Sequence, residues 1–515
     1  MKNTFLLFLA LLLSASLPAQ PLPFSKTEFE KLVMQVMKEY EVPGISIALV
    51  KDGNVILTKG FGKRKLGMSA PVDEHTVFGI ASNTKAFTAT AMALLAEEGK
   101  LSWNDRVIDY LPWFRLSDPY VTKELRIRDL FVHRSGLGLG AGDLLWWPKT
   151  VYDRKEIVRR LRHLPLAASF RSAYAYDNVL YTVAGEVIEA VSGMSWEEFM
   201  QQRILRPVGM NESTVLHSDA ANEGNIASTH ARVNGTVQIV QPFLSDITNP
   251  AGGINSNAVD MAKWLLVQLD SGKISNEKRL FRSSTTKELW SFITPKPISA
   301  PPKELAPMKA NFSGYGLGFN IQDYRGMKMI THTGGLPGYV SRVTMIPELN
   351  LGIAVLTNQE EEAAFMILTN YLLDRFMNAA KFDWLNAYLT LRKRDAEKKS
   401  SVEKSAEQTP QSPPLPIEKY CGTFRDAWYG EMSVSKNNDS LEIRFHQTPA
   451  LIGSLHYYRY TTFIARWYNR ELRADAYVTF SFNPDGSIES IHMSAVSPET
   501  DFSYDFQDLK FMPMK

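Results

Sequence analysis

The sequence predicts an α/β (α+β) fold with an antiparallel sheet flanked by helices, followed by a small all-β domain. Apolar-rich runs at 45–51 and 55–61 are joined through Asp52-Gly53, which is typical of a tight hairpin turn. Further strand-like runs lie near the end of the same domain, at 327–331, 340–346 and 351–357. Mostly helical and loop sequence separates the two sets of strands, which indicates a sheet drawn from both ends of the domain and a large helical insertion.

Three segments predict the main helices. Residues 86–96 are small and apolar almost all round, which is typical of a buried central helix, and Gly99 marks its end. Residues 181–191 carry an apolar stripe, and residues 363–377 predict a helix that closes the domain. This arrangement leaves a cleft between the sheet and the insertion, and such clefts are the usual place for ligands.

Residues 1–19 predict a cleavable secretory signal peptide. Lys2 supplies the positive start, residues 5–13 form an unbroken apolar run, and Leu17-Pro18-Ala19 places a small residue before the cleavage point. An apolar run this short does not span a bilayer. We therefore expect a periplasmic or secreted protein that has no integral membrane segment once the signal is removed.

The clearest domain boundary follows residue 391, so the first domain occupies residues 25–391. Residues 392–416 are charged and then rich in Ser, Gln and Pro, and because they bury little apolar surface they predict a linker. Residues 417–515 contain short strand-like runs separated by turns such as Asn483-Pro484-Asp485-Gly486, which predict a small barrel or sandwich. For this last domain, a structural or substrate-gating role and ligand binding inside a barrel are both open.

Composition and missing motifs exclude several classes of protein. The formal net charge is +2 with acidic and basic residues in balance, so no nucleic-acid partner is expected. Cys421 is the only cysteine, which excludes an internal disulfide framework. The sequence has neither the Gly-x-Ser-x-Gly of an α/β-hydrolase nor the His-Glu-x-x-His of a zinc protease, and we expect no metal and no cofactor. The glycine run 136–142 lacks dinucleotide-binding spacing and predicts a mobile loop at the cleft edge.

Ser82 and Lys85 form the most informative motif in the chain. The pattern Ser-x-x-Lys occurs at five places, but Ser82 is the copy that opens the predicted central helix. A serine in the first turn faces the positive end of the helix dipole, and a lysine three residues later lies on the same face. Burial disfavours the charge on a lysine and lowers its pKa, so Lys85 is suited to take a proton from the serine.

Two further motifs bring polar groups to the same cleft. Tyr-x-Asn occurs once, at Tyr176 and Asn178, and Lys/His-Thr/Ser-Gly occurs once, at His332. Taken alone, Tyr176 fits a core tyrosine and His332 fits a partly buried strand histidine. The three motifs in this order predict a serine nucleophile surrounded by an amine, a phenol, an amide and an imidazole. These are the groups that an acyl-enzyme mechanism requires.

With these motifs the chain resembles the serine β-lactamase and penicillin-binding D,D-peptidase superfamily, in particular class C β-lactamases and their esterase and D-aminopeptidase relatives. The resemblance covers about residues 30 to 380 and extends to stretches at 42–48, 130–137, 251–262 and 314–318. It implies a β-lactamase/transpeptidase-like fold for the first domain. The last domain is similar, less specifically, to the lipocalin-like domain that often follows such hydrolases.

The resemblance also implies a role for each motif residue. Ser82 would attack a carbonyl group, and Lys85 and Tyr176 would handle the protons, with the choice of first base between them left open. Asn178 would hydrogen-bond Lys85 and the acyl amide of the substrate. The oxyanion hole would consist of the backbone N–H groups of Ser82 and Gly335.

His332 departs from true β-lactamases, which usually carry lysine at this position. Because histidine is mostly neutral above a pH of about 7, recognition of a β-lactam carboxylate is in doubt, and anionic substrates should be handled better as the pH falls toward about 6. We expect a serine hydrolase that cleaves an ester or amide of a small-molecule or peptide substrate, as a carboxylesterase, a D-amino-acid peptidase or a weak β-lactamase. An acyltransferase using an alcohol or amine acceptor and a non-turnover penicillin-binding sensor are the alternatives, and the oligomeric state is left unknown.

Overall fold

The computed structural model describes residues 22–220, 224–403 and 412–514, so the predicted signal peptide lies outside the described residues. The first domain is built on an eight-stranded sheet with the order β2-β1-β12-β11-β10-β9-β8-β7. All of its strand pairs are antiparallel. Its strands are β1 (Gly44–Lys51), β2 (Asn54–Gly62), β7 (Thr294–Pro295), β8 (Ser313–Tyr315), β9 (Asn320–Tyr324), β10 (Met327–Leu336), β11 (Tyr339–Ile346) and β12 (Leu351–Thr357). The antiparallel sheet drawn from both ends of the domain is confirmed.

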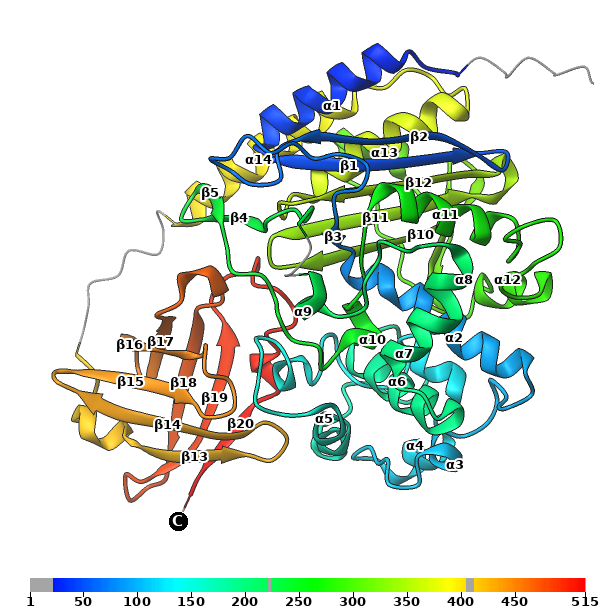
Figure 1. Cartoon of the computed structure of the whole chain (residues 1–515). Coiled ribbons are helices and arrows are strands. Elements are labelled where there is room, and N and C mark those ends of the chain that lie inside the picture. The colour runs from blue at the N-terminus through cyan, green and yellow to red at the C-terminus, as the bar shows by residue number, and fades with distance from the viewer. Residues whose placement is uncertain (1–21, 221–223, 404–411, 515) are drawn as a thin grey trace, which may run out of the picture.

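Helices cover both faces of this sheet because both faces of its central strands are apolar. In β1, Ile47 and Leu49 belong to one buried core cluster, whereas Ala48 and Val50 belong to another on the opposite face. The helices α1 (Lys26–Tyr40), α13 (Glu362–Phe376) and α14 (Trp384–Glu403) lie on the first face (Figure 1). The second face is covered by α11 (Ala258–Leu269), which packs on β1 and β12.

The helix α2 (Thr84–Glu97) is the centre of the insertion. Its residues from Thr84 to Leu95 are all buried, which confirms the central helix predicted from their small apolar side chains. The helices α6 (Val179–Ser192) and α10 (Asn249–Gly252) pack against it. The other elements of this region are α3 (Val107–Tyr110), α4 (Pro119–Glu124), α5 (Arg154–Arg160), α7 (Trp196–Met200), α8 (Arg206–Val208), α9 (His217–Ala220), α12 (Ser283–Leu289), β3 (Phe78–Gly79), β4 (His230–Val233), β5 (Thr236–Ile239) and β6 (Asn255–Ser256).

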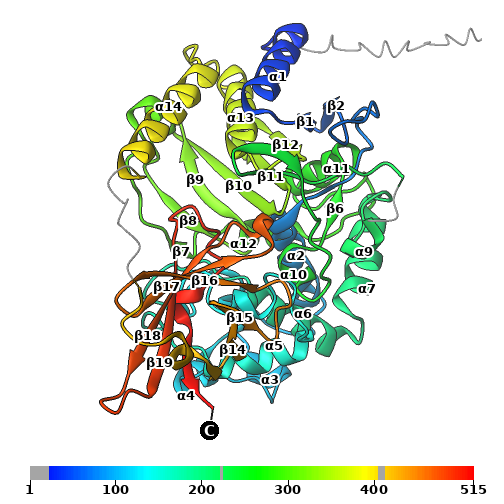
Figure 2. The ribbon, with the colours of Figure 1, turned by 90° about the vertical axis from the view of Figure 1, so that its left-hand side faces the viewer.

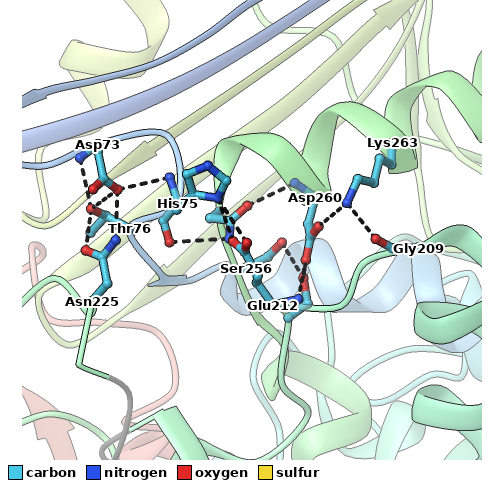
Figure 3. A network of polar contacts seen from close by, with 11 residues as sticks. Asp73, His75, Thr76, Gly209, Glu212, Asn225, Ser256, Asp260 and Lys263 are labelled. Atoms are coloured by element: carbon cyan, nitrogen blue, oxygen red, sulfur yellow. Dashed lines mark hydrogen bonds and ion pairs between the residues drawn. The ribbon is translucent and has the colours of Figure 1, made fainter.

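A polar network fastens the segment before α2 to α11 and to the loop after α8 (Figure 3). At its centre, the buried carboxylate of Asp260 accepts hydrogen bonds from Lys263 Nζ at 2.8 Å and from the backbone N–H of Glu212 at 3.0 Å. Glu212 in turn contacts His75 Nδ1 at 2.9 Å. Because β3 pairs with β6 directly beyond this network, the network fixes the chain that leads into Ser82.

The segment after 416 forms a closed barrel in which the strands pair in chain order from β13 to β20. They are β13 (Gly422–Asp426), β14 (Gly430–Asn437), β15 (Ser440–Phe445), β16 (Ile452–Arg459), β17 (Thr462–Trp467), β18 (Ala476–Phe482), β19 (Ile488–Ala495) and β20 (Lys510–Pro513). Buried aromatic side chains fill part of the core, and Tyr420 packs edge to face on Phe463 and Phe480 at centroid distances of 4.8 and 5.0 Å. The small all-β barrel domain is confirmed.

The helix α14 extends into the predicted linker. It continues to Glu403, although the charged composition from residue 392 onward indicated an unordered segment. Lys, Arg, Glu and Ala are good helix formers, and two arginines attach this stretch to the domain. Arg392 donates to the carbonyl of Glu39 at 2.8 Å, and Arg394 forms an ion pair with Glu304 at 2.7 Å.

The barrel lies beside the helical insertion and below the sheet in both ribbon views (Figures 1 and 2). Several hydrogen bonds hold it there. Tyr152 Oη donates to the carbonyl of Tyr429 at 2.6 Å, and Arg160 Nη1 donates to that of Trp428 at 3.0 Å. These hydrogen bonds form an interface between the two domains. Within the described residues, no helix combines the length and apolar character needed to cross a bilayer.

Candidate active site

A pocket between the sheet, the insertion and the barrel contains the site residues that were predicted from the sequence. Ser82, Tyr176, Asn178, His332 and Gly335 all line it. They come from the turn before α2, from the loop before α6 and from β10. Lys85 lies behind this surface, fully buried, with its ammonium group next to Ser82. The predicted convergence of the three motifs in one cleft is therefore observed.

Ser82 lies in a tight turn that the sheet holds in place. Ala81, directly before it, adopts a left-handed conformation with φ of 49°, which is unfavourable for residues other than glycine. The hydroxyl of Ser341 donates to the carbonyl of Ile80 at 2.8 Å and accepts from Asn83 Nδ2 at 2.7 Å. These bonds clamp the turn on both sides of Ser82 and so fix the position of its hydroxyl.

Gly334 permits β10 to approach this turn. A Cβ atom at Gly334 would lie 2.2 Å from the carbonyl oxygen of Ile80 and 2.9 Å from Cβ of Ala81. The glycine of the His-Thr-Gly motif is thus required by close backbone approach to the nucleophile turn. By contrast, no heavy atom lies within 4 Å of a Cβ built at Gly335, so that residue borders open space in the pocket.

The ammonium group of Lys85 has three hydrogen-bond acceptors around it. Its Nζ lies 3.0 Å from Ser82 Oγ, 2.7 Å from Asn178 Oδ1 and 3.0 Å from the carbonyl oxygen of Ala251. Burial lowers the pKa of Lys85 to about 7, although the carboxylates of Asp143 and Asp177 oppose this shift. Near neutral pH a substantial fraction of Lys85 is therefore uncharged and able to accept a proton.

Asp143 connects to Lys85 through Asn178, and sequence reasoning missed it. Asn178 Nδ2 donates to Asp143 Oδ2 at 2.8 Å, while its Oδ1 accepts from Lys85. Trp146 Nε1 donates to the other oxygen of Asp143 at 2.9 Å. Burial raises the pKa of the Asp143 carboxyl to about 7, against these hydrogen bonds and the charge of Lys85. The only sequence signal for Asp143 was its place at the end of the glycine run.

Tyr176 is the second polar group beside Ser82. Burial raises the pKa of its hydroxyl well above the ordinary value, whereas a hydrogen bond with Ser82 lowers it. Lys85 Nζ lies 4.9 Å from the centre of the Tyr176 ring, and the His133 ring lies 4.3 Å from it. The phenol therefore stays protonated at neutral pH and is placed to donate a hydrogen bond or a proton.

His332 is held as a neutral ring. Its Nδ1 lies 2.6 Å from the carbonyl oxygen of Thr333, which can only accept, so Nδ1 carries the proton. Its Nε2 then accepts from the hydroxyl of Tyr315 at 2.7 Å. Burial, followed by the charge of Lys85, lowers the pKa of His332 to about 3. The expectation that His332 gains charge as the pH falls toward about 6 is wrong, because burial disfavours the charged ring.

The barrel domain supplies part of the pocket wall, which the sequence did not indicate. Asp501, Phe502 and Ser503 line the pocket together with Ser82. The Phe502 ring meets the Tyr176 ring edge to face at 5.8 Å. Ser503 is buried, and its hydroxyl donates to Asp143 at 2.9 Å. The site is thus built from both domains.

The glycine run 136–142, which the sequence predicted to be a mobile loop at the cleft edge, is packed against the barrel. Gly140 has φ of +70°, and a Cβ there would lie 2.5 Å from the carbonyl oxygen of Phe502. The carboxylate of Asp505 accepts from the backbone N–H groups of Gly142 at 2.6 Å and Leu144 at 2.9 Å. The glycines allow the two domains to pack closely against each other.

Three other charged residues line the pocket, namely Lys296, Glu362 and Asp501. Lys296 follows β7, and Glu362 begins α13. Burial raises the pKa of Glu362, and Arg342 lowers it. Within the described part of the chain, no group of three or more His, Cys, Asp or Glu side chains is arranged to hold a metal ion.

Comparison with known proteins agrees with this architecture. A family model described as Beta-lactamase matches residues 29–376. The chain belongs to the β-lactamase family. A second model, described as a domain of unknown function (DUF3471), matches residues 406–513, which contain the barrel.

Known proteins and solved structures match most of the chain. The unguisins hydrolase ungD' of Aspergillus campestris is 29% identical over 432 residues, which is 79% of this chain and 77% of that protein. Penicillin-binding protein 4 of Amycolatopsis lactamdurans is 25% identical over 357 residues, which is 65% of this chain and 86% of that protein. The octameric penicillin-binding protein homologue from Pyrococcus abyssi matches in structure with a TM-score of 0.61 and 22% identity, over 95% of this chain and 100% of that chain. The β-lactamase and penicillin-binding protein fold is confirmed.

Proposed function

We propose that the protein is an exported serine hydrolase that forms an acyl-enzyme on Ser82 and cleaves an ester or an amide. The observation that carries this proposal is the 3.0 Å contact between Lys85 Nζ and Ser82 Oγ, made by a fully buried lysine whose pKa is lowered to about 7. A lysine in this state accepts the hydroxyl proton at neutral pH, which activates the serine as a nucleophile.

Acylation follows from this geometry. Neutral Lys85 takes the proton as Ser82 Oγ bonds to the substrate carbonyl carbon, and the carbonyl oxygen takes up the negative charge. The backbone N–H groups of Ser82 and Gly335 form the oxyanion hole, and losing one such donor typically costs about 10²–10³ in rate. The leaving group departs with a proton from Tyr176, which regains it from Lys85. Between the two candidates for first base, the pKa values favour Lys85, because burial lowers that of Lys85 and raises that of Tyr176.

Deacylation uses the same groups in reverse. Water occupies the place that the leaving group vacates and attacks the acyl carbon while it gives one proton to Lys85, either directly or through Tyr176, which accepts that proton as it passes its own to Lys85. Ser82 Oγ then leaves and takes the proton back from Lys85. Asn178 keeps Lys85 aimed at Ser82 through the 2.7 Å bond to its Oδ1. An alcohol or amine in the place of water would give acyl transfer, and an acyl-enzyme that never turned over would give a sensor.

Two features support a hydrolase acting on small esters or peptides. The pocket walls carry both signs of charge together with aromatic rings, since Lys296, Glu362 and Phe502 line it. The relative from Aspergillus campestris is named as a hydrolase of unguisins, and that name supports cleavage as the reaction type. We further propose that residues 1–19 direct export to the periplasm or the medium.

The test is covalent labelling followed by turnover. A fluorophosphonate probe should label the wild type and not Ser82→Ala, and Ser284→Ala is the matched control because Ser284 and Lys287 repeat the Ser-x-x-Lys pattern elsewhere. Nitrocefin, short-chain aryl esters and D-amino-acid anilides are then compared as substrates, with and without an added alcohol. Labelling that persists in Ser82→Ala, or maps by mass spectrometry to Ser284, would reject Ser82 as the nucleophile.

A further inference from the structure

His133 is a buried imidazole next to the active site that the proposed mechanism does not use. Its ring packs on the Tyr176 ring with centroids 4.3 Å apart and meets the Tyr315 ring at 4.5 Å. Two features are unfavourable for a residue that only fills the core. The backbone of His133 has φ of +54°, and within the described residues its Nε2 has no hydrogen-bond partner. A phenyl ring would fill the same space without leaving a buried N–H unpaired.

The other ring nitrogen of His133 explains why an imidazole stands here. Its Nδ1 lies 3.1 Å from the backbone nitrogen of Asp177, whose N–H only donates, so Nδ1 is the acceptor and Nε2 carries the proton. Burial, followed by the charges of Lys85 and Lys296, lowers the pKa of His133 well below its ordinary value. The ring is therefore neutral at neutral pH, and its Nδ1 remains free to accept.

The backbone carbonyl of His133 makes a second bond to the same segment. The N–H of Ala175 donates to it at 2.9 Å. Ala175 and Asp177 are the two neighbours of Tyr176 in the chain, so His133 holds the backbone on both sides of that tyrosine. Residues 174–177 belong to no helix or strand. Because no regular element orders this segment, its position depends on such individual bonds.

The position of this segment matters for the reaction. The hydroxyl of Tyr176 bonds Ser82 and, as general acid, must also reach the leaving atom. A displacement of about 1 Å in a group of this kind can lower the rate by about 10²-fold. Asp177 also precedes Asn178, which accepts from Lys85 at 2.7 Å. The segment that His133 holds therefore carries two of the groups around the nucleophile.

We propose that His133 is the positioning residue for Tyr176. Its carbonyl and its Nδ1 hold the chain before and after the tyrosine, and its ring supports the face of the phenol, so that the hydroxyl stays between Ser82 and the leaving group. His133 itself touches neither the substrate nor the nucleophile in this proposal. The assignment rests on the proposed function of Ser82 and Tyr176.

Two variants separate the acceptor from the ring. His133→Phe keeps an aromatic ring beside Tyr176 but removes the acceptor. His133→Asn removes the ring but leaves a side-chain oxygen close to the place of Nδ1, and asparagine tolerates the left-handed backbone. The matched control is His492→Phe, which makes the same change at an exposed histidine of the barrel.

A pair of esters with different leaving groups detects the position of the general acid. The esters 4-nitrophenyl acetate and 4-nitrobenzyl acetate form the same acetyl-enzyme, but nitrophenolate leaves without a proton and the benzyl alkoxide needs one. In His133→Phe, kcat/KM for the benzyl ester should fall by about tenfold or more relative to the phenyl ester, a part of the about 10²–10⁴ that general acid catalysis is worth. His133→Asn should keep the wild-type ratio within about threefold, and His492→Phe should not change it. Both esters meet the same folded enzyme, so the ratio does not respond to a loss of stability.

Hydrogen exchange separates failure of this proposal from failure of the proposed function. Mass spectrometry of peptides that contain residues 175–178 should show exchange about tenfold faster in His133→Phe, as expected for a lost hydrogen bond, and close to wild type in His133→Asn. This measurement needs no turnover, so it supports or overturns the bonds to His133 even if the wild type hydrolyses neither ester, a result that would reject the hydrolase. Unchanged exchange in His133→Phe, equal losses on the two esters, or a ratio in His133→Asn as low as that in His133→Phe would overturn the role of His133.

Discussion

The hydroxyl of Ser503 in the barrel donates a 2.9 Å hydrogen bond to Asp143 Oδ2, the same oxygen that accepts the amide of Asn178 at 2.8 Å. Asn178 in turn accepts from Lys85 at 2.7 Å. A chain of hydrogen bonds therefore runs from the barrel to the amine beside the nucleophile. The domain that sequence comparison describes only as a domain of unknown function is thus attached directly to the groups that position Lys85.

Ser503→Ala should reduce catalysis without unfolding the barrel. The variant removes one of the donors that hold the buried carboxylate of Asp143, and a lost hydrogen bond of this kind costs about 1–3 kcal/mol where a partner is left unsatisfied. We expect kcat to fall by about 5- to 50-fold, with a smaller change in KM. Steady-state kinetics on a neutral aryl ester measures this.

Two companion variants separate positioning from stability. Ser503→Thr keeps the hydroxyl and should recover part of the activity, and Ser435→Ala removes an exposed barrel serine and should behave as wild type. If Ser503→Ala lowered the melting temperature but left kcat unchanged, the contact with Asp143 would serve only to dock the barrel.

Asp143→Asn should move the acidic limb of the pH–rate profile to lower pH. The carboxylate of Asp143 raises the pKa of Lys85, which burial lowers to about 7. Removing that negative charge lowers the pKa of Lys85 further, so the uncharged, proton-accepting form persists into more acidic solution. The measurement is kcat/KM for a neutral ester between pH values of about 5 and 9. A limb that stayed in place, or moved to higher pH, would show that Lys85 is not the group that titrates.

Lys85→Ala and Tyr176→Phe should each slow acylation by two or more orders of magnitude, since general acid–base catalysis is worth about 10²–10⁴. Both side chains contact Ser82, one through Nζ at 3.0 Å and the other through its hydroxyl. The double variant should lose much less than the product of the single losses, because the two groups pass the same proton. Rates of labelling by a fluorophosphonate probe give the comparison directly, and losses that multiply would mean that the two residues act in separate steps.

The sequence predicted the parts of the site that are local and missed those that depend on the folding of distant segments. Ser82 and Lys85 share one helical turn, and their pairing follows from spacing alone. Ser503 lies 360 residues from Asp143 and has no motif of its own, so only the docked barrel reveals the contact. Lys296 was missed as a pocket residue for the same reason, since it reaches the pocket from the segment between β7 and β8.

The sheet was similarly accessible to sequence reasoning. Strand pairs such as β1–β2 and β11–β12 follow from apolar runs separated by short turns. The short strands β7 and β8 were missed as strands, because two- and three-residue segments carry too little periodicity to be distinguished from loops. α14 was not predicted, because the charged composition from residue 392 onward indicates a linker and does not show that Arg394 reaches Glu304 at 2.7 Å.

The preference for an anionic over a neutral ester should not rise as the pH falls from about 8 to about 5. Only a histidine that gained charge in this range would make the preference rise on acidification, and burial instead lowers the pKa of His332 to about 3.

The ratio of kcat/KM for the acetyl esters of 3-hydroxybenzoate and of methyl 3-hydroxybenzoate measures this preference, because the two leaving groups differ only in charge and effects on Ser82, Lys85 and Tyr176 cancel in the ratio. The wild type should give a ratio that does not climb on acidification, because His332 stays neutral in this range. A ratio that instead climbed between pH values of about 7 and 5 would restore His332 as the residue that meets the carboxylate, and would require the Tyr315 hydroxyl to release its Nε2.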